Sequence, residues 1–448
     1  MTDLAKPSRT AGQPEPSQGY RLYVLLMLVL VYTFNFLDRQ ILGILAIPIK
    51  QDLGLSDTQL GLMGGLAFAV VYSTLAVPIA WLADRKSRTW IITWSLAIWS
   101  GFTMLCGAAG GFWQLFLARM GVGVGEAGGV APSYSLIADY FPAKHRARAL
   151  AAYSFGIPIG TAAGVLFGGL LAAQVDWRFA FLVVGGAGLV LAPIFKLTVR
   201  DPRRGGWETP AQPVDDGPAR ALGKSDGPVE AQAPAFGAVA AAVLPKASFW
   251  LLALGAAASS VCGYGVAFWL PSFFARSFEM SLTETSIFYA GIAFIGGMAG
   301  IWLGGVLADK FGGRSRGAYP LVPAVAFVIA MPIFFLAVNT NSQTAAFLLW
   351  LIPTGLNLAW LGPILTAVQH LGSSAMRSTV SAMFLLINNL IGIAGGLYYF
   401  GWASDLMAPR FGEESLRYAI YSGLGFYLLA TILFVIASRT LKRDWVES

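Results

Sequence analysis

The sequence Leu82-Ala83-Asp84-Arg85 returns 225 residues later as Leu307-Ala308-Asp309-Lys310. At the same offset, Ser56-Asp57-Thr58-Gln59 returns as Ser281-Leu282-Thr283-Glu284. The latter pair fits the S-x-x-[EQ] capping box, in which the serine side chain accepts a hydrogen bond from a free helix N–H and the glutamine or glutamate reaches back. A single capping box is weak evidence for any fold. Two linked elements repeated at one offset predict a duplicated helical unit.

The apolar pattern around this repeat predicts membrane-spanning helices. The chain has 448 residues, of which 56% are hydrophobic and only 12% charged, whereas soluble proteins have about 25% charged residues. Twelve apolar runs are each long enough to cross a hydrocarbon core of about 30 Å as a helix of about 20 residues. The predicted spans are 22–47, 58–82, 90–110, 113–135, 149–173, 178–198, 248–273, 284–308, 318–338, 344–368, 379–403 and 416–437. We therefore predict an all-α membrane protein with twelve transmembrane helices in two pseudo-symmetric six-helix bundles.

Residues 199–247 interrupt the apolar pattern and divide the chain into two halves. Their richness in proline, glycine and mixed charge disfavours a packed core. We interpret this stretch as a cytoplasmic linker, with a partner-docking segment as the alternative. The predicted organisation is a cytoplasmic N-terminal tail (1–20), a first bundle (21–198), the linker (199–247), a second bundle (248–437) and a cytoplasmic C-terminal tail (438–448).

The basic residues predict the orientation of the helices. The formal net charge of +7 also suits nucleic-acid binding, but the basic residues are distributed as in a membrane protein. With a cytoplasmic N-terminus, inside segments hold 23 of the 30 lysines and arginines and outside segments hold 5. By the positive-inside rule, both termini are cytoplasmic. We expect a multi-pass monomer of the cell membrane that binds no nucleic acid.

No cofactor or metal is expected. Cys106 and Cys262 lie in separate apolar runs and form no metal-binding or disulfide pattern. Gly123-x-Gly125-x-x-Gly128 fits the dinucleotide fingerprint, but that motif needs a preceding strand. Since it lies inside a predicted span, close packing of small residues against another helix explains it better.

Four charged residues fall well inside the predicted spans, and all are in the first half: Asp38 and Arg39 in the first helix, Arg119 and Glu126 in the fourth. A charge at the bilayer centre costs about 3 kcal/mol, so such residues usually face a cavity or one another. A structural salt-bridge cluster is one interpretation, because the four charges sum to zero. We favour a functional site, since apolar residues would fill a purely structural position at lower cost.

Helix geometry suggests how these charges are paired. Arg119 and Glu126 are seven residues apart, which is two turns of one helix face. Asp38 and Arg119 lie at similar depth from the outer surface, so Asp38 can reach Arg119, whereas Arg39 points about 100° away, toward a packing or gating role. Protonation of either acid would release an arginine. We predict that Asp38 and Glu126 couple protons and that Arg119 is the principal residue that binds the substrate anion, through its planar fork of donors. Arg39 is a second candidate for substrate binding.

The loops after the second helix of each half resemble a known family motif. Gly305-Val-Leu-Ala-Asp309-Lys310-Phe-Gly312-Gly-Arg314 resembles the G-x-x-x-D-[RK]-x-G-x-[RK] loop of the major facilitator superfamily. In the first copy, Ala80 and Ser87 replace the two glycines, but the charged positions remain. The resemblance implies cytoplasmic gating residues, and simple anchoring by positive charge is the alternative. The gating candidates are Asp84, Arg85, Arg88, Asp309, Lys310 and Arg314.

Two further strings resemble Spinster-type transporters. Asn35-Phe-Leu-Asp38-Arg39 is similar to their N-[YF]-[LM]-D-R, and residues 119–127 are similar to their R-x-x-x-G-x-G-E-A. The resemblance implies a proton-coupled, alternating-access transporter of a lysophospholipid or a sphingosine-1-phosphate-like lipid. A symporter of a small soluble organic anion remains the alternative, because anion:cation symporters share similar strings.

The expected partners are thus an amphipathic or anionic small-molecule substrate, protons and membrane lipids. The second half would add polar cavity residues, for which the candidates are Tyr264, Asn357, Trp360, Asn388 and Asn389. An intramembrane enzyme is not expected, because an aspartyl protease needs two deep aspartates and only Asp38 is deep, and no Ser–His pair lies within the spans.

Overall fold

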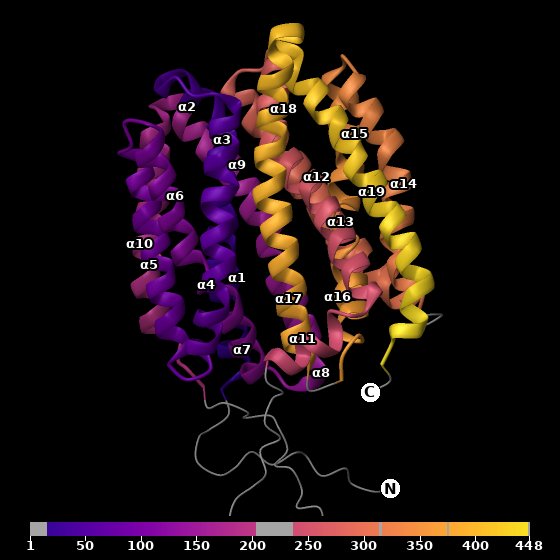
Figure 1. Ribbon diagram of the computed structural model, residues 1–448. Coiled ribbons are helices and arrows are strands. Elements are labelled where there is room, and N and C mark those ends of the chain that lie inside the picture. Colours follow the sequence, from indigo (N-terminus) through magenta and orange to yellow (C-terminus); the bar gives the residue numbers. More distant parts are fainter. Residues whose placement is uncertain (1–15, 203–235, 313–315, 374–375, 447–448) are drawn as a thin grey trace, which may run out of the picture.

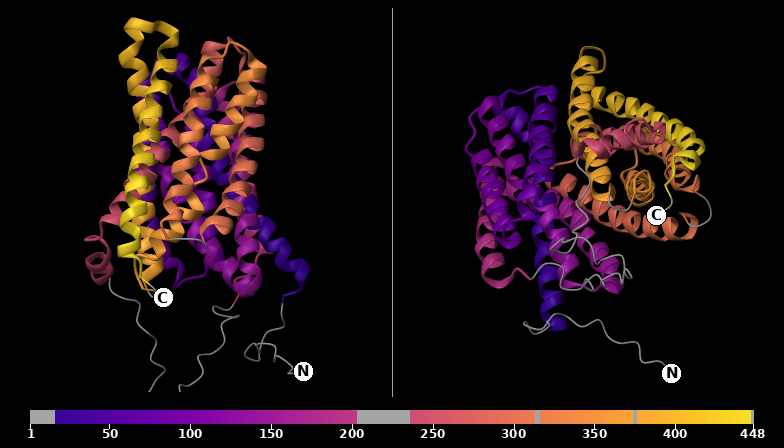
Figure 2. Two further views of the ribbon diagram at one scale, coloured as in Figure 1. Left: turned by 90° about the vertical axis from the view of Figure 1, so that its right-hand side faces the viewer. Right: turned by 60° about the horizontal axis from the view of Figure 1, so that its bottom comes forward.

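The computed structural model describes residues 16–202, 236–312, 316–373 and 376–446, and within these ranges every regular element is a helix. The helices form two bundles that lie side by side, one from each half of the chain (Figure 1). The right view of Figure 2 shows the same division from below, with the indigo-to-magenta half separate from the half that ends in yellow. The first and last described helices, α1 and α19, begin and end at the same side of the molecule, which we name the inner end.

The helices follow the predicted spans. The first half consists of α1 (Gln18–Ile44), α2 (Ala46–Leu53), α3 (Asp57–Gly64), α4 (Leu66–Ala83), α5 (Arg88–Gly107), α6 (Phe112–Glu126), α7 (Val130–Tyr140), α8 (Ala143–Ser154), α9 (Gly156–Gln174) and α10 (Trp177–Thr198). The second half consists of α11 (Phe236–Val243), α12 (Ala247–Ser277), α13 (Leu282–Gly312), α14 (Ala318–Asn339), α15 (Gln343–Leu356), α16 (Leu361–Gln369), α17 (Arg377–Asn389), η3 (Leu390–Gly395), α18 (Gly396–Phe411), η4 (Gly412–Glu414) and α19 (Ser415–Asp444).

Ten helical segments of the described chain are long and apolar enough to cross a membrane. One of them, Thr379–Asp444, has 66 residues and contains two crossings, the first formed by α17, η3 and α18 and the second by α19. The remaining crossing is formed by α6 and α7, which a turn at 127–129 separates, so neither helix is long enough to count alone. The fold therefore has twelve crossings, and the predicted fold class is confirmed.

Both predicted capping boxes are present. The Ser56 hydroxyl accepts from the Gln59 N–H at 3.2 Å, and the Gln59 side chain accepts from the Ser56 N–H at 2.9 Å. At the start of α13, Ser281 and Glu284 make the same two bonds at 3.3 and 2.9 Å. The duplicated signal in the sequence therefore marks the outer start of the second crossing in each half.

Two local features depart from the sequence analysis. The apolar end of the predicted linker forms the short helix α11, which buries Val239 and Val243 completely. The eleventh crossing contains η3, a π-helix of six residues between two α-helical segments. Residues 203–235, which make up most of the predicted linker, and residues 1–15 of the N-terminal tail lie outside the described residues.

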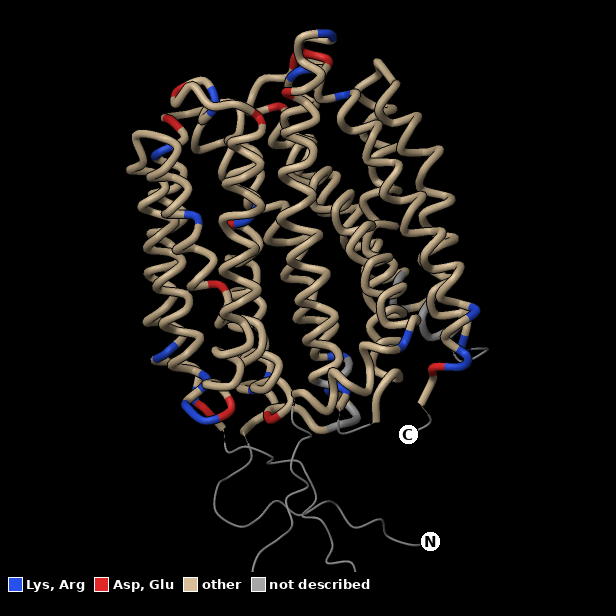
Figure 3. The backbone as a smooth tube through the Cα atoms, viewed as in Figure 1, with Lys and Arg blue, Asp and Glu red and all other residues tan. Residues whose placement is uncertain are grey.

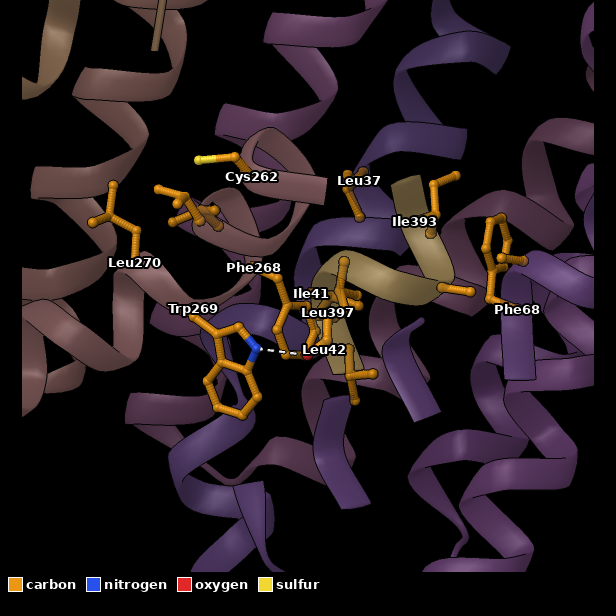
Figure 4. Packing of buried hydrophobic residues seen from close by; sticks show 14 of the residues in the cluster. Leu37, Ile41, Leu42, Phe68, Cys262, Phe268, Trp269, Leu270, Ile393 and Leu397 are labelled. Atoms are coloured by element: carbon orange, nitrogen blue, oxygen red, sulfur yellow. Dashed lines mark hydrogen bonds between the residues drawn. The ribbon is translucent and has the colours of Figure 1, made fainter. Parts of the chain in front are cut away.

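The two halves meet where α9 packs against α13, α3 against α18, α4 against η3 and α17, and α1 against α12. Figure 4 shows part of this seam, where Leu37, Ile41 and Leu42 of α1 lie close to Phe268 of α12 and Leu397 of α18. The Trp269 indole N–H donates to the Leu397 carbonyl at 2.9 Å and so ties α12 to α18. The charged residues gather at the two ends of the molecule, with a few at mid-depth in the first half (Figure 3).

Candidate transport site and outer closure

An ion pair at mid-depth joins α1 and α6. The Arg39 Nε atom lies 2.7 Å from the Glu126 Oε2 atom. Glu126 is completely buried, whereas 14% of the Arg39 side chain is exposed. The Arg39 guanidinium also lies over the rings of Phe36, Phe68 and Tyr72, at 5.1, 4.7 and 4.7 Å from their centroids. Aromatic faces attract cations, so Arg39 is held by one carboxylate and three rings.

The second pair of charges is buried inside the first half. Asp38 and Arg119 are each only 1% exposed. The Arg119 Nη1 atom donates to the Asp38 backbone carbonyl at 3.3 Å. The Asp38 carboxylate itself makes no hydrogen bond with the described residues, although Thr103 and Cys106 of α5 lie beside it. Arg119 therefore faces the core of its own bundle.

The two arginines differ in exposure and in partners. From sequence, Arg119 was expected to be the principal anion-binding residue, and Arg39 a second candidate that points toward a packing or gating role. In the structure Arg39 is the partly exposed arginine and bonds to Glu126, whereas Arg119 has almost no exposed surface. The separation of about 100° between Asp38 and Arg39 would direct Arg39 away from the site only if the first helix had a single functional face. Asp38 and Arg39 instead use two adjacent faces of α1, and both faces contact other helices.

Of the second-half candidates, Tyr264 of α12 is brought close enough to Arg39 to interact with it electrostatically. The Asn388 side chain accepts from the Ser260 hydroxyl at 2.9 Å and lies 3.4 Å from that of Asn389. Tyr264 thus lies near the charge cluster, whereas Asn388 and Asn389 interact within the second half.

The other two candidates, Asn357 and Trp360, also pack within the second half. Asn357 accepts from the Tyr427 hydroxyl at 3.1 Å, and both residues line an internal cavity of about 50 Å³. Trp360 is 6% exposed and packs edge-on against Phe384.

The gating candidates of the first half form no bond to the second half among the described residues. Arg88 is buried, and its guanidinium pairs with Asp139 of α7 and with Asp201, which lies shortly after α10 at the start of the linker. Arg85 folds back onto the Trp81 ring, at 3.8 Å from its centroid. Asp84 is exposed and its side chain has no hydrogen-bond partner among the described residues.

The second copy of the inner loop is described only in part. Asp309 and Lys310 lie in the last turns of α13, and only their backbone is described. Arg314 lies outside the described residues. The predicted gating role of these three residues therefore stays a prediction.

The outer end carries a charge cluster that the sequence analysis missed. Asp57, at the start of α3, is 1% exposed, and Arg276 at the end of α12 donates to its two carboxylate oxygens, both at 2.8 Å. Lys50 of α2 donates to the same carboxylate at 2.7 Å and Ser404 of α18 at 2.8 Å. One aspartate of the first half is thus bonded to two helices of the second.

A second carboxylate, which belongs to the second half, also links the two halves at the outer end. Asp405 of α18 accepts from the backbone N–H groups of Asp57 and Thr58, at 3.2 and 2.7 Å, and from the Thr58 hydroxyl at 2.6 Å. A carboxylate is stabilised at a helix N-terminus by the free N–H groups and the helix dipole. The second half therefore adds a cap to α3 beyond the capping box that α3 already has.

Glycines allow the two backbones to approach below these bonds. A Cβ atom on Gly61 of α3 would lie 2.4 Å from the Leu397 carbonyl oxygen of α18. A Cβ on Gly401 of α18 would lie 2.3 Å from the Asp57 carbonyl oxygen of α3. Real Cβ atoms do not approach so closely, so the closed outer end requires glycine at both positions. The polar contacts and this glycine seam together form what we name the outer closure.

Comparison with known proteins identifies the class. Residues 28–396 match the model of the Major Facilitator Superfamily, and the chain belongs to this superfamily of membrane transporters. Within it, the chain is of the Spinster type. It is 28% identical to human protein spinster homolog 1, with 94% of this chain and 83% of the relative covered. An MFS-type efflux pump of Mycolicibacterium smegmatis is 31% identical, with 94% and 93% covered.

A solved structure supports both the fold and the conformation. A bacterial homolog of the human lysosomal transporter Spinster, in an inward-facing and unoccupied conformation, superposes with a TM-score of 0.83 at 32% identity. The alignment covers 96% of this chain and all of that one. An inward-facing state has its outer end closed, as the contacts of Asp57 and Asp405 close it here. The protein is therefore an alternating-access transporter, and its closed outer end agrees with the inward-facing conformation of that homolog.

Proposed function

We propose that this transporter couples the movement of protons to that of an amphipathic anion, such as a lysophospholipid or a sphingosine-1-phosphate-like lipid, across the cell membrane. The observation that carries the proposal is the Arg39–Glu126 pair. A fully buried carboxylate neutralises an arginine that keeps some exposed surface. Protonation of the carboxylate would remove the charge partner of the arginine, and arginine is always charged. The proton and the substrate anion would thereby be coupled through one guanidinium.

The surroundings of Arg39 suit an amphipathic anion. Its planar fork of donors matches a phosphate or a carboxylate in two contacts at once. Phe36, Phe68 and Tyr72 surround the guanidinium, and these rings offer apolar surface to the chain of a lipid. Tyr264 of the second half is near enough to Arg39 to interact with it electrostatically, so a substrate bound here would lie close to both bundles.

Asp38 and Arg119 form the second stage of the proposal. The Asp38 carboxylate is buried beside Arg119 without a hydrogen bond to the described residues. Burial favours the neutral form of a carboxyl group and a nearby arginine favours the charged form. A proton that leaves Glu126 would find a second acceptor in the same bundle.

Transport by purified protein in liposomes tests this proposal. Wild-type protein is expected to take up protons when a lysophospholipid is added. Glu126→Gln and Asp38→Asn are each expected to abolish proton-driven transport while substrate counterflow survives. Full proton-driven uptake in both variants would refute the coupling role. Proton flux with small organic acids but not with lysophospholipid would favour the symporter of small soluble anions.

Substrate binding separates the two arginines. Arg39→Lys keeps the charge but loses the fork, so it is expected to weaken binding at least tenfold, about 1.4 kcal/mol. Arg119→Lys, inside the bundle, is expected to weaken binding less. Calorimetry on purified protein measures both. The reverse order would return the anion site to Arg119, as the sequence analysis predicted.

A further inference from the structure

A cavity of about 370 Å³ opens at the inner end of the second half, between α14 and α19, away from the charge cluster of the first half. It is lined by Gly317, Leu321, Ser438, Arg439 and Lys442. We propose that this cavity binds the headgroup of an anionic phospholipid from the inner leaflet of the membrane. Such a lipid would be a bound partner of the transporter and not its transported substrate.

The charge of the cavity is positive, and no acid among the described side chains balances it. Arg439 and Lys442 are three residues apart on α19, and both are exposed. Neither forms an ion pair with an acid in the described part of the chain. Asp444, the nearest acid along α19, is already bonded to the Arg443 Nε atom at 3.1 Å and to the Ser248 N–H at 3.2 Å. The two cations of the cavity are therefore available to an external anion.

The start of α14 adds further positive character to the same place. Gly317 is the N-cap residue, no side chain caps this end, and the first turn contains no acid. A Cβ atom on Gly317 would lie 3.6 Å from the Lys442 Cε atom, so the lysine side chain passes over the helix start. Free N–H groups and the helix dipole make a helix N-terminus favourable for anions and unfavourable for cations. An anion in the cavity would relieve this conflict and bond to both partners.

The walls above the cavity are apolar and exposed. On α19, the face that carries Arg439 and Lys442 continues toward the membrane centre at intervals of three and four residues, which keeps side chains on one helix face. Its exposed members are Leu428, Ile432 and Val435. On α14, the corresponding exposed members are Leu321, Val325 and Val328. Exposed apolar side chains at this depth face lipid tails, so both helices offer a path for acyl chains above the headgroup.

This combination favours a lipid over a soluble anion. Free phosphate would use the two cations and the helix start but would leave the apolar walls unused. The position also suits an inner-leaflet lipid, since α14 begins and α19 ends at the inner membrane surface, where anionic lipids attract lysine and arginine. Figure 3 shows basic residues clustered at the lower end of the last helix.

Native mass spectrometry of the purified full chain tests the proposal, with phosphatidylglycerol, phosphatidylcholine or inorganic phosphate added. Wild-type protein is expected to retain phosphatidylglycerol in preference to phosphatidylcholine. The double variant Arg439→Gln/Lys442→Gln is expected to bind phosphatidylglycerol about thirtyfold more weakly, because each basic residue at the surface contributes to binding. Leu321→Trp fills the cavity without changing the charge and is expected to reduce retention as well.

A matched control removes the same charge from the inner end of the first half. Arg148 and Arg200 are exposed there, and neither side chain has a bond among the described residues. Arg148→Gln/Arg200→Gln is expected to leave retention unchanged. Equal losses in the two double variants would show a general charge effect and overturn the site. Unchanged retention in both cavity variants would overturn it too, as would displacement of the lipid by an equal concentration of inorganic phosphate.

Discussion

At the outer end, the Asp57 carboxylate of the first half is held by Arg276 and Ser404 of the second, whereas at the inner end Arg88 is held by Asp139 of its own half and by an acid that directly follows that half in the chain. The two clusters use the same chemistry with opposite consequences. When the two bundles rock, bonds within a bundle persist and bonds between bundles break. The outer cluster therefore contributes to the conformational equilibrium, while the inner cluster stabilises the first bundle in every state.

The strongest test of this comparison removes the arginine that links the halves. Arg276→Ala leaves Asp57 buried with fewer partners, and breaking a buried ion pair typically costs about 3 kcal/mol. Because this cost falls on the outer-closed state, the variant is expected to shift toward the outward-open state. Distances between spin labels at exposed outer positions, such as Gln51 and Glu413, measure the shift. The native cysteines, Cys106 and Cys262, are buried.

The matched control for Arg276→Ala is Lys50→Ala. Lys50 binds the same carboxylate at 2.7 Å but belongs to the first half. Its removal weakens a bond that exists in both conformations. An equal shift in the two variants would mean that the carboxylate, and not the link between halves, controls closure.

A steric test acts on the glycine seam. Gly61→Ala places a Cβ atom 2.4 Å from the Leu397 carbonyl oxygen, and such overpacking costs about 2 kcal/mol. The clash exists only while α3 lies against α18, so the variant is expected to open the outer end. Gly101→Ala is the control, because its Cβ would meet no atom within 4 Å. Unchanged label distances in Gly61→Ala would show that the seam tolerates a methyl group.

A smaller effect is expected from the cap that crosses between the halves. Asp405→Asn weakens the carboxylate that binds the start of α3, a contribution of about 1 kcal/mol. It is expected to shift the label distances modestly toward the outward-open state. Ser56→Ala removes a cap that lies within the first half, so it is expected to lower the melting temperature without moving the distances. A larger conformational shift from Ser56→Ala would contradict this distinction.

The smallest effect is expected at the inner end, with the opposite sign. The Asp84 side chain has no partner in the part of the chain that the structure describes, so Asp84→Asn removes no described contact from the outer-closed state. The family resemblance implies that this loop braces the outward-open state. We expect a shift of less than about 1 kcal/mol toward the inward-facing state, measured with the same labels. A shift toward the outward-open state would exclude the bracing role.

The sequence predicted the parts of the fold that depend on local patterns. The twelve spans follow from apolar runs, and the two capping boxes follow from residues three positions apart. The burial of Asp38, Arg119 and Glu126 also follows, because the charges lie in the middle of apolar runs. In each case the information needed is within one helix.

The pairing of charges depends on how whole helices are rotated against one another, and no local pattern contains this. The partner of Glu126 turned out to be Arg39 because α1 contacts its neighbours on several faces. Asp57 looked like an ordinary first-turn acid of a capping box, since its partners in the second half, Arg276 and Ser404, are 219 and 347 residues away. The repeat offered one signal, because the residue equivalent to Asp57 in the second copy is Leu282.

The π-helix η3 determines which residues of the eleventh crossing face α3. An α-helix turns about 100° per residue, and a π turn accommodates one additional residue. The residues of α18, which follow this π turn, are therefore rotated about the helix axis by about 100° from the positions that they would have in a continuous α-helix. If the same residues formed a continuous α-helix, Ser404 and Asp405 would be rotated about 100° around the helix axis, away from α3. The outer end would then lose its closure with every contact residue still present, so the π turn is itself part of the outer closure.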